Sequence, residues 1–159
     1  MIGYYDNKDA TNEIIKLHHD GLYWIHTGDL GRVDKDGLVY IEGRLKRMIV
    51  RYDGFKVFPP FIEKIVLTNS AIEACCAVGL PDKANGQGSL PIVFCVKKPG
   101  STKTEEQIVS ELKTECLNSL PEYSQPIGFR FISILPVTAI GKVDYRALEE
   151  MAKEDTGHD

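Results

Sequence analysis

The apolar run from Ile92 to Val96 constrains the fold of this chain more than any other segment. A strand with no polar residue on either face is typical of the centre of a sheet that is covered on both sides. The run is far too short to cross a bilayer. Two groups of apolar residues recur at helical spacing: Ile62, Ile65 and Val66, and Ile108, Leu112 and Cys116. The sequence therefore predicts the α+β class, with a small mixed β-sheet flanked by helices.

The order of the predicted elements follows from these periods and from turn signals between them. Before residue 43 we expect a short helix over residues 10 to 17, capped by Thr11 or Asn12, and strands within residues 22 to 42 that are joined by a turn at Asp34–Gly37. After a boundary near Gly43 to Lys46, we expect a hairpin, helices over 59 to 68, 104 to 118 and 144 to 153, and strands over 74 to 79, 91 to 97 and 129 to 135.

Composition and charge narrow the classes of function. The chain has 159 residues, of which 43% are apolar and 26% charged, and these values are typical of one ordinary globular domain. Its net charge of -4 gives no electrostatic basis for binding nucleic acid or a membrane. The four cysteines lack a CxxC spacing, so we expect buried free thiols and a cytoplasmic protein. His18 and His19 have no second pair, and we expect no metal site.

A lysine near the end of the chain follows a sharp turn. Lys142 comes directly after Gly141, and Pro136 ends the strand-like run before it. A lysine held at the tip of such a loop can reach a phosphate or a carboxylate outside its own domain. The alternative interpretation is an ordinary surface lysine between a strand and a helix.

A second motif places a carboxylate at the end of a strand. The run Leu22–Ile25 is followed by Thr27-Gly28-Asp29, where Gly28 permits a tight turn. A carboxylate in this position can accept two hydrogen bonds from a sugar diol. A hairpin with a common Gly-Asp turn is the alternative.

A third motif combines a basic hairpin with the start of a helix. Met48–Val50 and Phe55–Val57 read as two short strands around an Asp53–Gly54 turn, and Pro59-Pro60 then opens a helix. Four cations gather beside this hairpin: Arg44, Lys46, Arg47 and Arg51. A basic surface hairpin without further function is the alternative.

In this order and spacing, the three motifs resemble the C-terminal part of the adenylate-forming enzyme superfamily. That superfamily includes acyl- and aryl-CoA synthetases, adenylation domains of nonribosomal peptide synthetases, and luciferases. The resemblance covers residues 3 to 152. It implies that residues 1–43 are the tail of a large N-terminal adenylation domain, forming a β-hairpin remnant. Residues 44–154 would be a mobile C-terminal domain and residues 155–159 a disordered tail.

The resemblance also implies roles for single residues. Lys142 matches the catalytic lysine of the adenylation half-reaction. Asp29 and Arg44 match the residues that contact the ribose of ATP and AMP. Lys46 lies where the family has its hinge, about which the small domain rotates between two half-reactions.

The hairpin matches the family element that enters the active site for thioester formation. Arg51, Tyr52 and Gly54 would contact CoA or the thioester-forming site. The chain departs from the family in three places. Asp53 stands where the family often has a glycine, Phe61 stands where it usually has a glutamate, and the familiar Gly-Glu after the next strand reads Gly86-Gln87-Gly88.

The function implied is an ATP-dependent, AMP-forming carboxylate–CoA ligase, an acyl-CoA synthetase that uses ATP, Mg²⁺ and CoA. The family's phosphate loop and acyl pocket are not found here, so the chain alone is expected to be inactive and to bind no cofactor. Its partners would be the missing N-terminal adenylation domain, a carboxylic acid and CoA. The alternatives are the C-terminal part of a peptide-synthetase adenylation domain and a stand-alone binding module without enzymatic activity. Apolar residues within 22–42 predict self-association when the large domain is absent.

Overall fold

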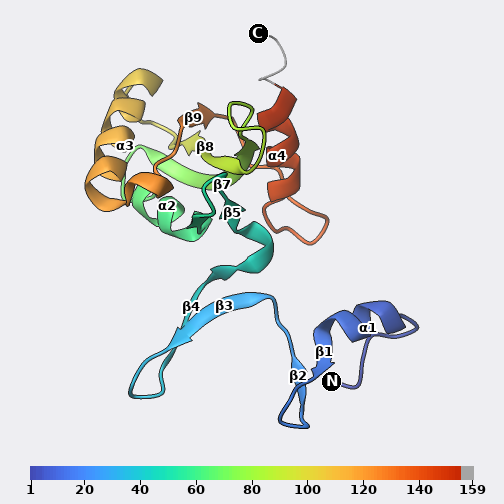
Figure 1. The fold of residues 1–159 in the computed structure, drawn as a ribbon. Helices are drawn as coiled ribbons and strands as arrows, with labels where there is room; N and C mark the ends of the chain where they lie inside the picture. Colours follow the sequence, from blue (N-terminus) through green and yellow to red (C-terminus); the bar gives the residue numbers. More distant parts are fainter. Residues whose placement is uncertain (155–159) are drawn as a thin grey trace. The chain divides into compact units, whose positions relative to one another are not determined.

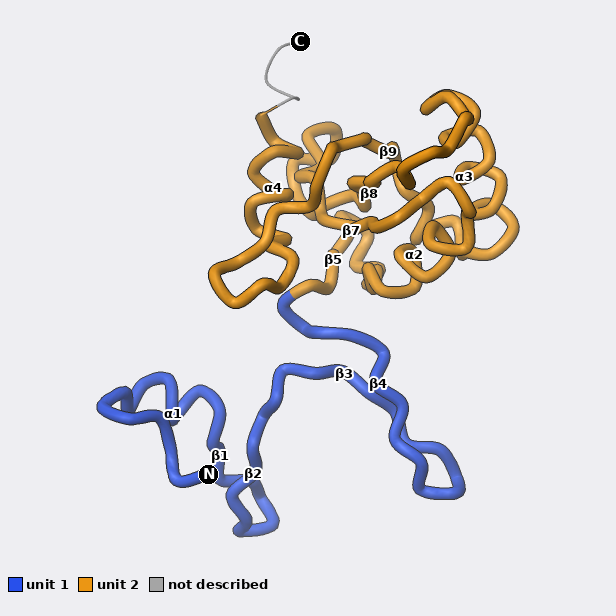
Figure 2. The backbone as a smooth tube through the Cα atoms, turned by 180° about the vertical axis from the view of Figure 1, so that it is seen from behind, with its two compact units in different colours: residues 1–46 blue, residues 47–159 orange. Residues whose placement is uncertain are grey.

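The computed structural model describes residues 1–154, and the chain divides into two compact units after Lys46 (Figures 1 and 2). The first unit contains helix α1 (Lys8–Ile14) and strands β1 (Ile15–Leu17), β2 (Tyr23–Ile25), β3 (Asp29–Val33) and β4 (Val39–Arg44). A short 3₁₀ helix, η1 (Leu45–Arg47), includes the point of division. The second unit contains β5 (Ile49–Val50), β6 (Lys56–Val57), α2 (Pro59–Val66), β7 (Ile72–Pro81), β8 (Ser89–Lys97), α3 (Glu105–Ser119), η2 (Glu122–Ser124), β9 (Gly128–Phe131) and α4 (Tyr145–Glu154).

The second unit is built on a three-stranded mixed sheet in which β8 is central. Strand β8 runs antiparallel to β7, with Cys95 opposite Cys75, and parallel to β9, with Val93 opposite Phe129. The hairpin of β5 and β6 forms a separate two-stranded sheet. This arrangement confirms the predicted α+β class with a small mixed sheet and flanking helices.

The central strand is buried on both faces, as its apolar run predicts. Val93 and Cys95 face a core that includes residues of α2 and α3, whereas Ile92 and Phe94 face a core shared with α4. These four side chains are at most 4% exposed. Figure 1 shows α3 and α4 on opposite sides of the sheet. The second unit therefore has three layers, and its two cores alternate along β8.

The predicted strand over 129 to 135 is wrong at its C-terminal end. Strand β9 stops at Phe131, and the backbone pairing with β8 ends with the hydrogen bond from Ile132 N to Cys95 O, at 3.0 Å. Leu135 is still buried, but in the connection that packs on the α4 side of the sheet. Leu135 lies in a loop that covers the sheet, and its apolar side chain made the strand pattern in the sequence look longer than the strand is.

The first unit differs from the prediction in its pairing. Helix α1 begins earlier than expected because Asn7 caps it, accepting a hydrogen bond from Ala10 N at 2.9 Å. The following residues form β1, whose Ile15 lies opposite Ile25 of β2. Strands β3 and β4 then form a second, separate hairpin around the predicted Asp34–Gly37 turn. The expectation of a helix to residue 17 is therefore wrong, whereas the predicted strands joined by a turn at Asp34–Gly37 are confirmed by β3 and β4.

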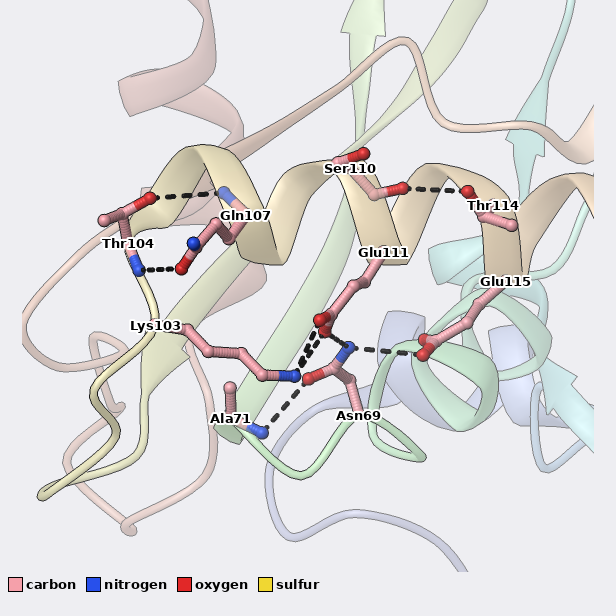
Figure 3. A network of polar contacts seen from close by, with 9 residues as sticks. All are labelled: Asn69, Ala71, Lys103, Thr104, Gln107, Ser110, Glu111, Thr114 and Glu115. Carbon is pink, nitrogen blue, oxygen red and sulfur yellow. Dashed lines mark hydrogen bonds and ion pairs between the residues drawn. The ribbon is translucent and has the colours of Figure 1, made fainter.

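Helix α3 is fixed by a capping box and by a polar network (Figure 3). Thr104 and Gln107 exchange side-chain and backbone hydrogen bonds at its N-terminus. The buried Asn69, in the turn after α2, donates to Glu111 and Glu115 on α3 and accepts from Ala71 N. This single amide connects the α2–β7 turn to two successive turns of α3.

All four cysteines are free thiols, three buried and Cys75 partly buried, as the sequence predicts. Burial raises the pKa of Cys76 and Cys95 to about 12 and that of Cys116 to about 11, and it also raises the pKa of Cys75. In the folded chain the thiols therefore stay protonated at pH values at which exposed thiols ionise.

We expect this difference to weaken the fold in mild alkali. Because the folded pKa values lie above the ordinary value of 9.0, the thiols contribute stability below pH 9 that is lost as the pH rises towards 12. Each thiol removes about 1.4 kcal/mol at one pH unit above its unfolded pKa. Urea unfolding at pH 8 and at pH 10 measures how much the free energy of unfolding falls between the two pH values, which is the slope of stability against pH. Cys116→Ala should make this slope shallower by the contribution of one thiol. Equal slopes in the two proteins would contradict the assignment.

Candidate functional site

Lys142 lies at the end of a closed loop before α4. Val137 and Val143 form an antiparallel bridge, and Thr138 N donates to Lys142 O at 2.7 Å. Gly141 takes a φ of +76°, a left-handed conformation that glycine adopts without strain. The side chain of Lys142 is exposed and forms no hydrogen bond or ion pair within residues 1–154. The loop therefore holds a free cation on a backbone that is fixed on both sides.

The residues after Lys142 attach this loop to α4. Asp144 N donates to Pro136 O at 2.8 Å, and the Asp144 carboxylate accepts from Arg146 N and Ala147 N at the start of the helix. Leu148, one turn further on, is fully buried against the sheet. Asp144 thus caps α4 and also binds the backbone of the lysine loop. Because α4 is packed on the sheet, this residue fixes the loop relative to the domain core.

Asp29 and Arg44 lie opposite each other on β3 and β4. Arg44 Nε is 2.7 Å from Asp29 Oδ1, and the Arg44 side chain remains 62% exposed. Gly28 has a φ of +76°, and Thr27 Oγ1 accepts from Asp29 N at 3.1 Å, which sets the turn that places Asp29 at the strand start. The two predicted sugar-binding residues are therefore adjacent, with an acceptor and a donor side by side. The cross-strand register that joins them was not predicted.

The predicted site residues are distributed over both units. Asp29 and Arg44 belong to the first unit and Lys142 to the second. Lys46 is exposed and is the last residue of the first unit, within η1. The structure thus brings together Asp29 and Arg44, the two residues predicted to contact a sugar, and places Lys142 on a different compact body.

The hairpin after η1 forms as predicted, with its turn at Arg51–Gly54. Gly54 N donates to Arg51 O at 3.0 Å, and Gly54 has a φ of +83°. Arg51 forms an ion pair with Asp53 and donates to Tyr123 O at 3.3 Å. The Asp53 hydrogen bond raises the pKa of Arg51, and Arg51 lowers the pKa of Asp53, so both remain charged. The Arg51 side chain is only 17% exposed, whereas Tyr52 is 43% exposed.

Sequence reasoning missed the role of Arg47, the first residue of the second unit. Its guanidinium forms an ion pair with Glu63 of α2 and donates to Ala77 O of β7 at 3.4 Å. Glu63 in turn accepts from Ala77 N at 2.9 Å. Burial alone would lower the pKa of Arg47, but the hydrogen bond and charge of Glu63 raise it above its ordinary value. Arg47, the residue after the predicted hinge, is therefore anchored in the domain core. The only sequence feature that could have indicated this anchor is its ion-pair partner Glu63, the last residue of Pro-Pro-Phe-Ile-Glu.

The histidines and the helices give no further site. His18 contacts His26, with the two Nε2 atoms 2.7 Å apart. No three histidine, cysteine or acidic side chains gather in a cluster able to hold a metal within residues 1–154. None of the helices in this part of the chain has the length and apolar character to cross a membrane.

Comparison with known proteins identifies a family match in the second unit. The AMP-binding enzyme C-terminal domain matches residues 62–142, about half of the chain. A long-chain-fatty-acid–CoA ligase of Salmonella typhimurium is 37% identical over 153 residues, which cover 96% of this chain and 25% of that enzyme. The chain thus spans about a quarter of the length of this relative.

Two solved structures resemble nearly the whole chain. An anthranilate CoA ligase in complex with anthranoyl-AMP has a TM-score of 0.81 and 26% identity, and the match covers 98% of this chain and 28% of that one. An O-succinylbenzoate coenzyme A synthetase from Bacillus subtilis, in complex with ATP and magnesium, has a TM-score of 0.74 and 28% identity, with 93% and 28% coverage. The similarity includes the first unit as well as the domain matched by the family.

Proposed function

The chain belongs to the AMP-binding enzyme C-terminal domain family, and from this premise we propose that it is the C-terminal part of an ATP-dependent, AMP-forming carboxylate–CoA ligase. The observation that carries the proposal is the Lys142 loop. Its backbone is held by a bridge and a helix cap, while its cationic side chain has no partner within residues 1–154. A fixed loop with a free charge is suited to meeting an anion that another domain supplies.

The first half-reaction assigns a role to Lys142. A carboxylate oxygen attacks the α-phosphorus of ATP, the bond to pyrophosphate breaks, and an acyl-adenylate forms. Such a reaction gains more from placed charge than from a protein nucleophile. We assign to Lys142 the stabilisation of negative charge that develops between the carboxylate and the α-phosphate.

Asp29 and Arg44 are suited to the sugar of the nucleotide. A carboxylate accepts hydrogen bonds from vicinal hydroxyls, and a guanidinium donates to their oxygens. Both groups lie side by side on β3 and β4, and Asp29 has a second oxygen beyond the one paired with Arg44. Magnesium would be held by the phosphates and by residues outside this chain, because no acidic cluster suited to it occurs within residues 1–154.

The second half-reaction requires a different surface at the same carbonyl. A thiol sulfur attacks the acyl carbon, a thioester bond forms, and AMP leaves with the bonding electrons. We propose that rotation about Lys46 exchanges the Lys142 loop for the hairpin of Arg51, Tyr52 and Gly54. The division of the chain into compact units after Lys46 supports a hinge at this residue.

We propose that the substrate is a carboxylic acid. The relatives act, by name, on a long-chain fatty acid, anthranilate and O-succinylbenzoate, and a carboxylic acid is the class that these three share. A place in fatty acid metabolism rests on the first of these relatives. We propose the cytoplasm as the compartment, because four free thiols suit a reducing environment. CoA is favoured over a carrier-bound thiol because these relatives are named as CoA ligases.

Carboxylate-dependent exchange of pyrophosphate into ATP tests the proposal. We expect no exchange above buffer for the 159-residue chain alone, and exchange once the chain is joined to a large adenylation domain. Activity of the chain alone would overturn the assignment as a part of the enzyme. Light scattering of the same preparation tests the expected self-association, since Trp24, Val39 and Ile41 in the first unit are about half exposed or more.

A further inference from the structure

The connection between β7 and β8 contacts the Arg51–Gly54 hairpin through a glycine. Gly88 has a φ of +73°, and a Cβ built there would overlap Tyr52 N and lie 2.6 Å from the carbonyl carbon of Arg51. Real Cβ atoms do not approach backbone this closely, and backbone cannot move aside as a flexible side chain can. The hairpin therefore rests directly on the main chain of residue 88, at a position that only glycine can occupy.

The β7–β8 connection is itself well fixed. The buried carboxylate of Asp82 accepts hydrogen bonds from Ala84 N, Asn85 N and the Asn85 side chain, at 2.7 to 3.2 Å. Its backbone closes the loop, with Asp82 N donating to Gly88 O and Gly86 N donating to Asp82 O, both at 3.0 Å. This loop can therefore serve as a rigid support.

The same hairpin is held at a second place by η2. The rings of Phe55 and Tyr123 stack with centroids 4.7 Å apart and an interplanar angle of 15°. Arg51 bridges its own turn to this segment, because it pairs with Asp53 and donates to Tyr123 O. The Arg51 guanidinium is thus engaged within the domain, which fits a residue that shapes the hairpin.

We propose that Gly88 is a positioning residue for thioester formation, fixing the Arg51–Gly54 hairpin before the thiol acceptor arrives. This inference rests on the proposed function of the hairpin. A turn that is already ordered loses little conformational freedom on meeting the acceptor. A displaced turn misplaces the exposed Tyr52, and a misplacement of about 1 Å can cost about a hundredfold in rate.

Gly86 supplies a matched control in the same loop. Its φ of +68° is nearly that of Gly88, but a Cβ on Gly86 meets nothing within 4 Å. Gly86→Ala and Gly88→Ala therefore introduce similar left-handed strain, and only Gly88→Ala pushes on the hairpin. Phe55→Leu, which weakens the contact with Tyr123, gives a second variant if Gly88→Ala folds poorly.

Amide hydrogen exchange on the 159-residue chain tests the contact without reference to activity. The amides of Arg51 and Gly54 close the turn, so their exchange reports its opening. We expect Gly88→Ala to speed their exchange about tenfold or more relative to Val93 in the central strand. Gly86→Ala should stay within about twofold of the wild type, and Phe55→Leu should act in the direction of Gly88→Ala. Unchanged exchange in Gly88→Ala would overturn the proposal whatever the function.

The two half-reactions, measured with the chain joined to its large domain, test the role. Gly88→Ala should lower kcat/KM for the thiol about tenfold to a hundredfold, while pyrophosphate exchange stays within about twofold. A merely structural defect would lower both half-reactions together. Normal thioester formation on a loosened hairpin would overturn the positioning role and leave the adenylation proposal standing. Absence of pyrophosphate exchange in the wild type would contradict the proposed function and, with it, the positioning role. Amide hydrogen exchange would still test the contact between Gly88 and the hairpin.

Discussion

Replacing Lys142 with alanine, in this chain joined to its large domain, is expected to slow carboxylate-dependent pyrophosphate exchange by about a hundredfold or more. One charge placed in a closed site contributes about 3 kcal/mol or more to stabilising a transition state. The loop backbone is held by Thr138, by the Val137–Val143 bridge and by the Asp144 cap, none of which involves the lysine side chain. The substitution therefore removes the charge and leaves its support unchanged.

Thioester formation separates this role from a general loss of activity. With acyl-adenylate supplied, Lys142→Ala should form thioester within about threefold of the wild type, because the second half-reaction uses the hairpin in place of the lysine loop. Lys113→Ala, an exposed lysine on α3, serves as the control for removing a surface charge from the same unit. Equal losses in both half-reactions would show that Lys142 supports the fold or the binding of both substrates, and the assignment would fail.

The elements that the sequence predicted well are those whose pattern is set locally. The two-sided burial of Ile92–Val96 followed from an unbroken apolar run. The α3 helix followed from helical spacing, and the hairpin followed from the Asp53–Gly54 dipeptide, of which only Gly54 takes a positive φ in a turn that spans Arg51–Gly54. These signals need no knowledge of what lies across the sheet.

The errors occurred where pairing decides the structure. Residues 15–17 suit either a helix end or a strand, and their partner at 23–25 determined the outcome. The closeness of Asp29 and Arg44 depends on a register that includes a bulge after Leu30, which no local pattern specifies. Arg47 resembled one more surface cation, because its partners Glu63 and Ala77 are distant in sequence. The site residues were therefore identified by resemblance, and their supports only by the structure.

Replacing Lys46 with proline is expected to have the opposite effect to Lys142→Ala. Proline fixes φ near -65°, which matches the 3₁₀ conformation of η1, so the variant should fold. The chain already accepts proline at the second position of a helix, since Pro60 occupies it in α2. What proline resists is the change of φ that a hinge at this residue requires.

If the second unit alternates between two orientations, Lys46→Pro should affect the two half-reactions unequally. Lys46→Pro should reduce thioester formation about a hundredfold while pyrophosphate exchange stays near the wild-type rate, because a single orientation supports only one half-reaction. Lys46→Ala removes the same side chain and leaves φ free, so it should retain both half-reactions within about threefold. The anchoring of Arg47 to Glu63 and β7 concentrates any rotation at the residues before it, since the ion pair holds the first residue of the second unit against its own core. If Lys46→Pro performs both half-reactions at the wild-type rate, the hinge lies elsewhere or the domain does not rotate, and the exchange of the Lys142 loop for the hairpin must be abandoned.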